Sequence, residues 1–243
     1  MKMTYKLLWQ DQFDKDGYLN SDIWTIETGG NGFGNNEAQF YTNQEKNIYV
    51  KDQMLHIVAH KEDYEHRHYT SGKLSTYQKK HIKYGRIEVE AKLPKGSGTW
   101  PAIWLLGENK KEVGWPMCGE IDLIEHIGRR PGQFHFSLHT QTFNHKKNNH
   151  LTYVYDDLSL LDDFQTYSME WDEGQISFYI NQKLMATFKK SKHATQEDWP
   201  YDQPFHLIIN LAIGGHWGGA IDESIFPVEF KIKSVKVYER SES

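Results

Sequence analysis

The chain has 243 residues, enough for one large all-β or α/β domain or for two small domains. Charged residues make up 25% of it, the formal net charge is −5 and the lysines occur in scattered pairs, so we expect no nucleic-acid partner. No apolar run approaches the roughly 18 residues of a membrane span, and the single cysteine, Cys118, excludes an internal disulfide and any multi-cysteine metal site.

Residues 1–13 do not match a secretory signal. They contain at most three consecutive apolar residues, whereas a signal peptide needs a run of about seven or more. We expect either a cytoplasmic chain or one from which a signal was removed, and the sequence leaves the compartment open.

Short apolar or alternating segments predict strands through the N-terminal half of the chain. These segments are 5–9, 24–26, 47–59 (a hairpin), 73–78, 84–93 and 101–106. Residues 29–41 contain four glycines and predict an irregular surface loop. The polar stretch 61–71 predicts a second loop.

The C-terminal half continues the pattern. Further strands are predicted at 134–140, 164–171, 175–180, 184–188 and 204–213. The polar segment 189–203 predicts one helical turn, and GGHWGG at 214–219 predicts a loop. Near the end, Phe230 and Ile232 fall out of phase with Val235 and Val237, which predicts a β-bulge.

About a dozen strands, turn signals every 8 to 12 residues or so, and almost no helical periodicity predict a two-sheet antiparallel β-sandwich. No linker, repeat or change of composition divides the chain. We therefore expect one all-β domain covering residues 1–243.

The segment GEIDLIEHIG, residues 119–128, sets three carboxylates into an otherwise apolar strand. Alternation with period two places Glu120 and Asp122 on one face, but would then bring Ile124, not Glu125, to that face. One extra residue in a β-bulge restores Glu125 to the carboxylate face, and bulges are common beside active sites. The spacing therefore predicts E-x-D-x-x-E with a bulge.

Three acids on one face repel each other, which raises the pKa of at least one and retains a proton near neutral pH. Retaining glycoside hydrolysis needs this combination: an ionised nucleophile, and a general acid about 5–5.5 Å away. Glu120 and Glu125 would lie roughly 13 Å apart on a fully extended strand, so the bulge must close the gap. A divalent-cation site and a solvated edge strand are the rival interpretations.

Four other segments accompany this motif: NNEAQFY at 35–41, GRIEVEAKLPKGSGTWPAIWLLG at 85–107, GWP at 114–116 and NLAIGGHWGG at 210–219. Together the five segments resemble glycoside hydrolase family 16, and within it the laminarinase-like β-glucanases. The resemblance implies a jelly-roll β-sandwich with a concave substrate cleft. It also implies endo-acting, retaining hydrolysis of internal β-1,3 or mixed β-1,3/1,4 glucan linkages, with the β-glucan polysaccharide as the partner. We expect a monomer that needs no cofactor.

By position, Glu120 resembles the family's nucleophile, Glu125 its acid/base and Asp122 the residue that assists the nucleophile. The same comparison gives the candidate substrate contacts Asn36, Arg86, Trp100, Trp104, Trp115, His126, His139, Asn210 and Trp217. Among them, Trp104 and Trp115 resemble sugar-contacting residues near the cleaved bond, and Trp217 a platform at the rim. Packing in the core is the rival interpretation for each tryptophan.

The 13 histidines raise the alternative of a metal site. His135 and His139 would lie about 13 Å apart on a straight strand, too far to share an ion bound at about 2 Å from each ring. Many relatives carry an aspartate in the last strand that binds a structural calcium ion, and this chain has Lys233 there. We therefore expect no bound metal. For Cys118, the default interpretation is a buried, inert thiol.

Two other functions stay open on the sequence alone. A carbohydrate-binding lectin on the same sandwich would use the aromatic platforms, although it has no use for three converging acids. A hydrolase of a galactan such as agarose or carrageenan is the other alternative. The absence of a basic cluster disfavours sulfated polymers, which need Arg or Lys to pair their charge.

Overall fold

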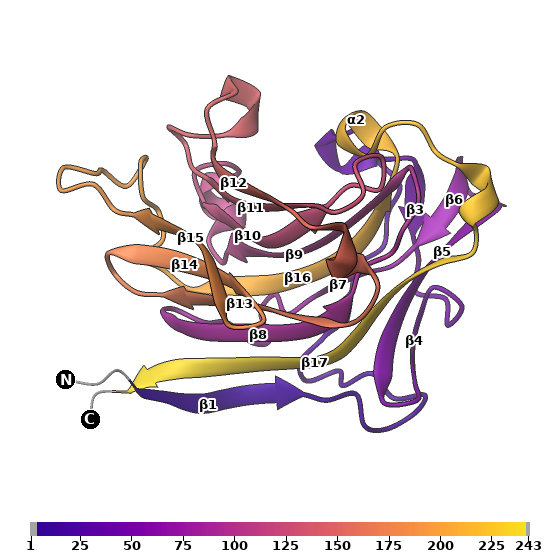
Figure 1. The fold of residues 1–243 in the computed structure, drawn as a ribbon, viewed down its shortest axis with the longest axis horizontal. Coiled ribbons are helices and arrows are strands. Elements are labelled where there is room, and N and C mark those ends of the chain that lie inside the picture. Colours follow the sequence, from indigo (N-terminus) through magenta and orange to yellow (C-terminus); the bar gives the residue numbers. More distant parts are fainter. Residues whose placement is uncertain (1–3, 242–243) are drawn as a thin grey trace.

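The computed structural model describes residues 4–241, whose strands form two stacked sheets (Figure 1). The ten-stranded sheet has the order β15 (Lys183–Lys189), β14 (Gln175–Ile180), β13 (Gln165–Trp171), β8 (Gly85–Lys92), β17 (Val228–Ser241), β5 (Met54–Tyr64), β6 (Arg67–Ser71) and β3 (Gln39–Tyr41), with β1 (Thr4–Asp11) paired to β17 and β4 (Ile48–Lys51) paired to β5. The first and last strands, β1 and β17, lie side by side in Figure 1 because they pair with each other.

The seven-stranded sheet has the order β12 (Leu151–Asp156), β11 (Gln133–His139), β10 (Glu120–His126), β9 (Thr99–Gly107), β16 (Phe205–Ile213), β7 (Lys73–Ser75) and β2 (Thr25–Ile26). In the part of the chain that the structure describes, helical structure is limited to the short α1 (Lys110–Val113) and α2 (Gly215–Gly218) and the 3₁₀ turns η1 (Gly32–Gly34), η2 (His145–Lys147), η3 (Leu158–Leu161) and η4 (Glu223–Ile225). Within residues 4–241, no helix has the length and apolarity needed to span a membrane.

The predicted two-sheet sandwich is confirmed. One apolar cluster fills the space between the sheets, with side chains from both. Strand β16 is central, as predicted: all nine of its residues are buried, and it pairs with β9 on one side and β7 on the other. Pairing is antiparallel except between β3 and β6, which run parallel.

Both predicted bulges are present. In β10 the register with β11 shifts between Asp122 and Glu125, and Leu123 and Ile124 both lie in the core, fully buried. Two consecutive apolar residues on the inner face return Glu125 to the outer face. In β17 the register with β8 shifts between Ile232 and Ser234.

Four local predictions need correction. Residues 61–71 are not a loop: β5 and β6 form a hairpin there, with Lys61 paired to Tyr69. Backbone pairing makes this hairpin, and its polar side chains give no apolar face that a sequence pattern could detect. Segment 29–41 is not wholly irregular, because it contains η1 and ends in β3. Segment 189–203 contains turns and no helix, whereas 214–219 contains the turn of helix α2.

Strand β12 was given no assignment from the sequence. It is the edge strand of the seven-stranded sheet and pairs only through β11. Four of its six residues are exposed, among them Tyr153 and Val154 at 40% and 37% exposure, and the other two are half-buried. An edge strand with little buried surface lacks the alternation that identifies the inner strands.

Candidate active site

The three acids lie on the outer face of the seven-stranded sheet, away from the shared core. Strand β10 runs between β9 and β11 and pairs with both. Glu120 is opposite His139, and Glu125 is opposite His135. Asp122 is opposite Trp104 of β9. The bulge therefore places all three carboxyl groups among the outward side chains of three adjacent strands.

A neutral donor holds Glu120. The indole Nε1 of Trp115 donates a hydrogen bond to Glu120 Oε2 at 2.9 Å. Beneath it, the Tyr201 hydroxyl lies 3.2 Å from the backbone carbonyls of both Glu120 and His139, which ties β10 to β11 at this point. Glu120 is thereby fixed at both its main chain and its side chain.

Glu125 has a similar donor on another strand. Trp100 of β9 donates from Nε1 to Glu125 Oε1 at 3.0 Å. The Trp100 ring packs edge-on against Trp217 of α2, with centroids 5.3 Å apart, and Trp217 also contacts the ring of His135 at 4.8 Å. This aromatic group flanks Glu125, as Trp115 flanks Glu120.

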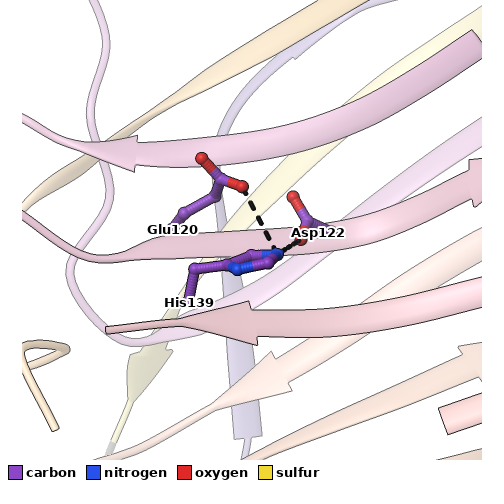
Figure 2. A group of neighbouring side chains, drawn as sticks. All are labelled: Glu120, Asp122 and His139. Carbon is purple, nitrogen blue, oxygen red and sulfur yellow. Dashed lines mark ion pairs between the residues drawn. The ribbon is translucent and has the colours of Figure 1, made fainter. Parts of the chain in front are cut away.

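His139 of β11 lies beside Glu120 and Asp122 of β10 (Figure 2), and Asp122 stands between the two glutamates in the strand. His139 Nε2 is 3.2 Å from Asp122 Oδ2 and 3.7 Å from Glu120 Oε1. The backbone N–H of His145 donates to His139 Nδ1 at 3.3 Å, which assigns the proton of the neutral ring to Nε2. The imidazole therefore presents an N–H to the two acids.

Ligand atoms of Glu120, Asp122 and His139 lie within 4.8 Å of one another, a spacing at which three residues can bind a metal ion. The hydrogen bond from His145 disfavours that use, because a ring nitrogen that carries a proton has no lone pair for a metal. Trp115 also donates to Glu120. The donors around these acids fit carboxylates that exchange protons better than a cation site.

Burial is the largest cause of the raised pKa values of the three acids. It raises the pKa of Glu120, Asp122 and Glu125 to about 8 in each case. The charge of Asp122 raises the pKa of the two glutamates further, whereas the hydrogen bonds from Trp115 and Trp100 oppose the rise. Such a group retains at least one proton near neutral pH.

Other predicted contacts are brought to the same face. Trp104 donates from Nε1 to Asn210 Oδ1 at 2.7 Å, so these two residues form one unit beside Asp122. Asn36 is exposed, in the loop that borders α2 through the bridge between Glu37 and Gly214. Trp104 and Asn210, together with Trp100, Trp115, His139 and Trp217, line the surface around the acids.

Two predicted contacts are wrong. Arg86 lies on β8 of the ten-stranded sheet, where its guanidinium pairs with Glu88 and Glu170 at 2.6 Å each. The whole core separates it from the acids. His126 is fully buried beside Phe134, and its Nε2 accepts a hydrogen bond from the backbone of Gly132. After the bulge, alternation turns His126 inward, so it supports the sheet.

The sequence missed several residues near the acids. His150 stacks on His139 with ring centroids 5.0 Å apart, and His145 contacts both His139 and Trp115. Both come from the 140–150 connection, for which the sequence gave no periodic pattern. Tyr201 was also missed, because the polar segment around it gave no sign that its hydroxyl reaches two strands. Only the tertiary structure brings these side chains to the site.

A family model described as "Glycosyl hydrolases family 16" matches residues 34–228. This chain belongs to that family. Family 16 membership makes it a glycoside hydrolase and confirms the resemblance drawn from its motifs. The glucanase and laminarinase relatives favour an enzyme over the lectin alternative.

Individual relatives are similar over most of the chain. A beta-glucanase of Rhodothermus marinus is 38% identical over 96% of this chain and 85% of that protein. The X-ray structure of the laminarinase from Rhodothermus marinus has a TM-score of 0.96 at 38% identity and covers 99% of both chains. A keratan-sulfate endo-1,4-beta-galactosidase of Sphingobacterium multivorum is 31% identical over 96% of this chain, which spans 55% of that protein. The jelly-roll prediction is confirmed by these structural neighbours.

The family's calcium site does not fit this chain. At the position that carries aspartate in many relatives, Lys233 places Nζ 3.0 Å from Glu90 Oε1 and 4.0 Å from the centroid of the Phe164 ring. Calcium at this position would need oxygen ligands. The structure has the Lys233 ammonium group there instead, paired with Glu90 and lying over the Phe164 ring. The residues here favour an internal ion pair over calcium.

Proposed function

We propose that this chain is an endo-acting, retaining β-glucanase that cleaves internal β-1,3 and mixed β-1,3/1,4 glucan linkages by double displacement. The observation that supports it best is the pair of indole donors, Trp115 on Glu120 and Trp100 on Glu125. Each glutamate is fixed by a separate neutral donor, so neither is neutralised by a permanent cation. That leaves the two carboxyl groups free to take different protonation states.

One difference between the surroundings of the two glutamates supports different roles for them. Each accepts a hydrogen bond from an indole, and the Asp122 charge raises the pKa of both. Glu120 also has His139 Nε2 at 3.7 Å from its Oε1, which favours its anion. In our proposal Glu120 is the ionised nucleophile, and Glu125 is the protonated general acid.

In the first step, a Glu120 oxygen attacks the anomeric carbon while the bond from that carbon to the glycosidic oxygen breaks. Glu125 gives its proton to the departing oxygen, so the leaving sugar departs as an alcohol. Asp122 assists Glu120 from the same face of β10, with His139 Nε2 3.2 Å from Asp122 Oδ2 and 3.7 Å from Glu120 Oε1, while the charge of Glu120 is transferred into the new ester bond.

In the second step, Glu125 is a carboxylate and accepts a proton from water. The water oxygen attacks the anomeric carbon from the side that the leaving group vacated, and Glu120 is released as a carboxylate. Two inversions at one carbon give net retention. The proton that Glu125 accepts from water restores the general acid, and the raised pKa of Glu125 keeps it protonated at neutral pH.

We propose that the glucan lies across the outer face of the seven-stranded sheet, in contact with the aromatic side chains there. Trp115 and His139 would contact the sugar beside Glu120, and Trp100 with Trp217 the sugar beside Glu125. Trp104, Asn210 and Asn36 would bind sugars further along. Apolar faces of pyranose rings pack on indoles, and the polar groups fix their orientation. We further propose that the chain acts as one domain and as a monomer.

A galactan hydrolase is the second candidate. It is supported by the 31% identity to the endo-1,4-beta-galactosidase, across nearly the whole chain. Glucose and galactose differ only at one hydroxyl group, so the catalytic acids would serve either sugar. The contacts that surround them decide the choice.

Product analysis on four polymers tests both candidates. Purified protein is incubated with laminarin, barley β-glucan, agarose and carrageenan, and the released sugars are measured by reducing-end assay and sized. We expect oligosaccharides from laminarin and barley glucan, with the β-anomer as the first product by proton NMR. Exclusive action on a galactan would overturn the glucan assignment, and release of an α-anomer first would overturn retention.

A further inference from the structure

A chain of buried hydrogen bonds links the surface loop at 29–41 to Trp104. It begins at Glu37, which is 5% exposed, and passes through Tyr41 and Asn210, which are 1% and 7% exposed. The Tyr41 hydroxyl donates to Glu37 Oε2 at 3.3 Å, Asn210 Nδ2 donates to the Tyr41 hydroxyl at 3.0 Å, and Trp104 donates to Asn210 Oδ1. None of these bonds belongs to the backbone ladder of the sheets.

The direction of every bond in this chain is fixed by its two ends. An indole N–H can only donate, so the oxygen of the Asn210 amide must face Trp104. The amide nitrogen then faces Tyr41, whose hydroxyl accepts this bond and directs its single proton to Glu37. An ionised carboxylate can only accept. The four residues therefore adopt one arrangement of donors and acceptors, and reversing one link would break the others.

The Glu37 carboxylate accepts two further hydrogen bonds. Gln39 Nε2 donates to its Oε2 at 2.7 Å, and Asn35 Nδ2 donates to its Oε1 at 3.2 Å. With Tyr41, three donors converge on the two oxygens of one buried carboxylate, which is how a buried charge is stabilised without an ion pair. On the C-terminal side of Glu37, the backbone is tied to β16 by the bond from Ala38 N to Ile213 O.

We propose that Glu37 is a positioning residue for substrate binding: through Tyr41 and Asn210 it fixes the orientation of the Trp104 indole at the outer face of the seven-stranded sheet. Trp104 lies opposite Asp122 on the neighbouring strand, so its ring orientation sets the shape of the surface beside the acids. The same carboxylate also anchors the loop that carries Asn36. One buried charge thus couples two substrate contacts; their role in binding rests on the proposed function.

The isosteric variant Glu37→Gln tests this directly. A glutamine side chain presents one oxygen and one NH₂ group to three donors, so at least one donor faces another donor. We expect KM for laminarin to rise about fivefold, with kcat close to that of the unchanged protein, because an unpaired buried donor costs on the order of 1 kcal/mol. Tyr41→Phe should have a similar effect. The KM of the double variant should be no higher than that of the more impaired single variant, because both substitutions break the same hydrogen-bond chain.

The matched control is Glu170→Gln on the ten-stranded sheet. Glu170 is also a partly buried carboxylate with several donors, namely Arg86 and the Tyr179 hydroxyl. This change should lower the melting temperature without moving KM. A general loss of stability is thereby distinguished from a specific effect on Trp104.

A second measurement does not depend on activity. The eight tryptophans give eight indole N–H signals in a ¹⁵N NMR spectrum, and Trp104→Phe identifies the one that belongs to Trp104. We expect this signal to move in Glu37→Gln and in Tyr41→Phe, and to stay in Glu170→Gln. An unmoved signal would overturn the hydrogen-bond chain. A moved signal with unchanged KM would overturn the positioning role, whereas absence of glucan cleavage in the unchanged protein would count against the proposed function alone.

Discussion

On the ten-stranded sheet, Glu88 and Glu170 flank the guanidinium of Arg86 at 2.6 Å, whereas on the seven-stranded sheet Glu120 and Glu125 are each held by a neutral indole. Both sheets carry partly buried acids on their outer faces. Glu88 and Glu170 share a full positive charge, whereas Glu120 and Glu125 have none; elsewhere on the seven-stranded sheet, Lys73 of β7 pairs with Glu27 at 3.1 Å. The difference separates acids that stabilise the fold from acids that are available for chemistry.

The pKa values follow this division. At Glu229 of β17, burial would raise the pKa, but hydrogen bonds from Lys231 and His56 outweigh it, and the pKa lies below its ordinary value. At Glu125 burial again raises the pKa, and the single bond from Trp100 is too weak to reverse the rise to about 8. A cationic partner keeps an acid ionised, and a neutral partner lets it keep a proton.

The largest expected effect comes from removing the acids themselves. Glu120→Ala and Glu125→Ala should each lower kcat at least about 10³-fold. With an activated aryl glucoside and added azide, Glu125→Ala should still form the glycosyl-enzyme and give the β-glycosyl azide. Glu120→Ala cannot form that intermediate, so azide should attack directly and give the α-product. The two configurations, read by NMR, assign the roles.

The opposite pairing of azide configuration and variant would show that the two roles are reversed. If Glu120→Ala kept near-normal turnover, the strand carrying these acids would not be the catalytic one. Glu88→Gln on the ten-stranded sheet is the control, and it should keep kcat within about twofold because Glu88 pairs with Arg86 on the opposite sheet from the acids, so that its loss affects stability and not turnover.

A smaller effect should follow from Trp100→Phe, which keeps an aromatic ring and removes the donor to Glu125. That bond favours the Glu125 anion and lowers its pKa, so its loss should raise the pKa and move the alkaline limb of kcat/KM to higher pH. We also expect kcat to fall about tenfold. The measurement is a pH–rate profile between pH 4 and 10.

Trp9→Phe is the control for this profile. Trp9 lies on β1 of the ten-stranded sheet, and its indole nitrogen has no hydrogen-bond partner among the described residues. Its replacement should leave the profile unchanged. An alkaline limb that moved to lower pH in Trp100→Phe would mean that the indole stabilises the protonated acid instead.

Stability should depend on pH with opposite signs on the two sheets. The folded pKa of Asp122 is raised, to about 8, so the folded state binds more protons than the unfolded one, and stability is lost as pH rises toward 8. Asp122→Asn should therefore raise the melting temperature more at pH 8 than at pH 4. A gain of 1 kcal/mol corresponds to about 2–4 °C in a chain of this size.

Glu229→Gln should show the reverse. The folded pKa of Glu229 is lowered, so its stabilisation is present above its unfolded pKa and lost as pH falls through the folded value. Its removal should lower the melting temperature at pH 7 and have little effect in strong acid. Melting scans of both variants across pH 3–9 make the comparison, and equal slopes would contradict it.

The smallest effect is expected from calcium. Because Lys233 pairs with Glu90 at the position of the family's calcium ligand, excess calcium after chelator treatment should shift the melting temperature by less than about 1 °C. Lys233→Asp is the informative variant, since it restores a carboxylate beside Glu90. A shift of many degrees in the unchanged protein would reveal a site elsewhere.

Much of this architecture could be predicted from periodicity. The β10 bulge followed from counting residues, because Leu123 and Ile124 are both apolar and Glu125 had to return to the outer face. The inner strand β16 was recognisable for the same reason. Edge elements such as the β5–β6 hairpin and β12 were missed, since a strand that buries little side-chain surface carries no apolar pattern.

The three acids of β10 and their spacing were visible in the sequence because they lie within six residues, and because charged side chains in an apolar strand are costly to bury. The partners of those acids were not, since they converge from distant segments. Arg86 stands in one of the motifs that resemble the family but lies on the other sheet, and Glu37 reaches Trp104 only through a fold that joins residues more than a hundred positions apart. The alternation and bulges of a strand depend on residues that are neighbours in the sequence. The hydrogen bonds to the side chains of the site depend on which strands pack together, and that is decided only by the tertiary structure.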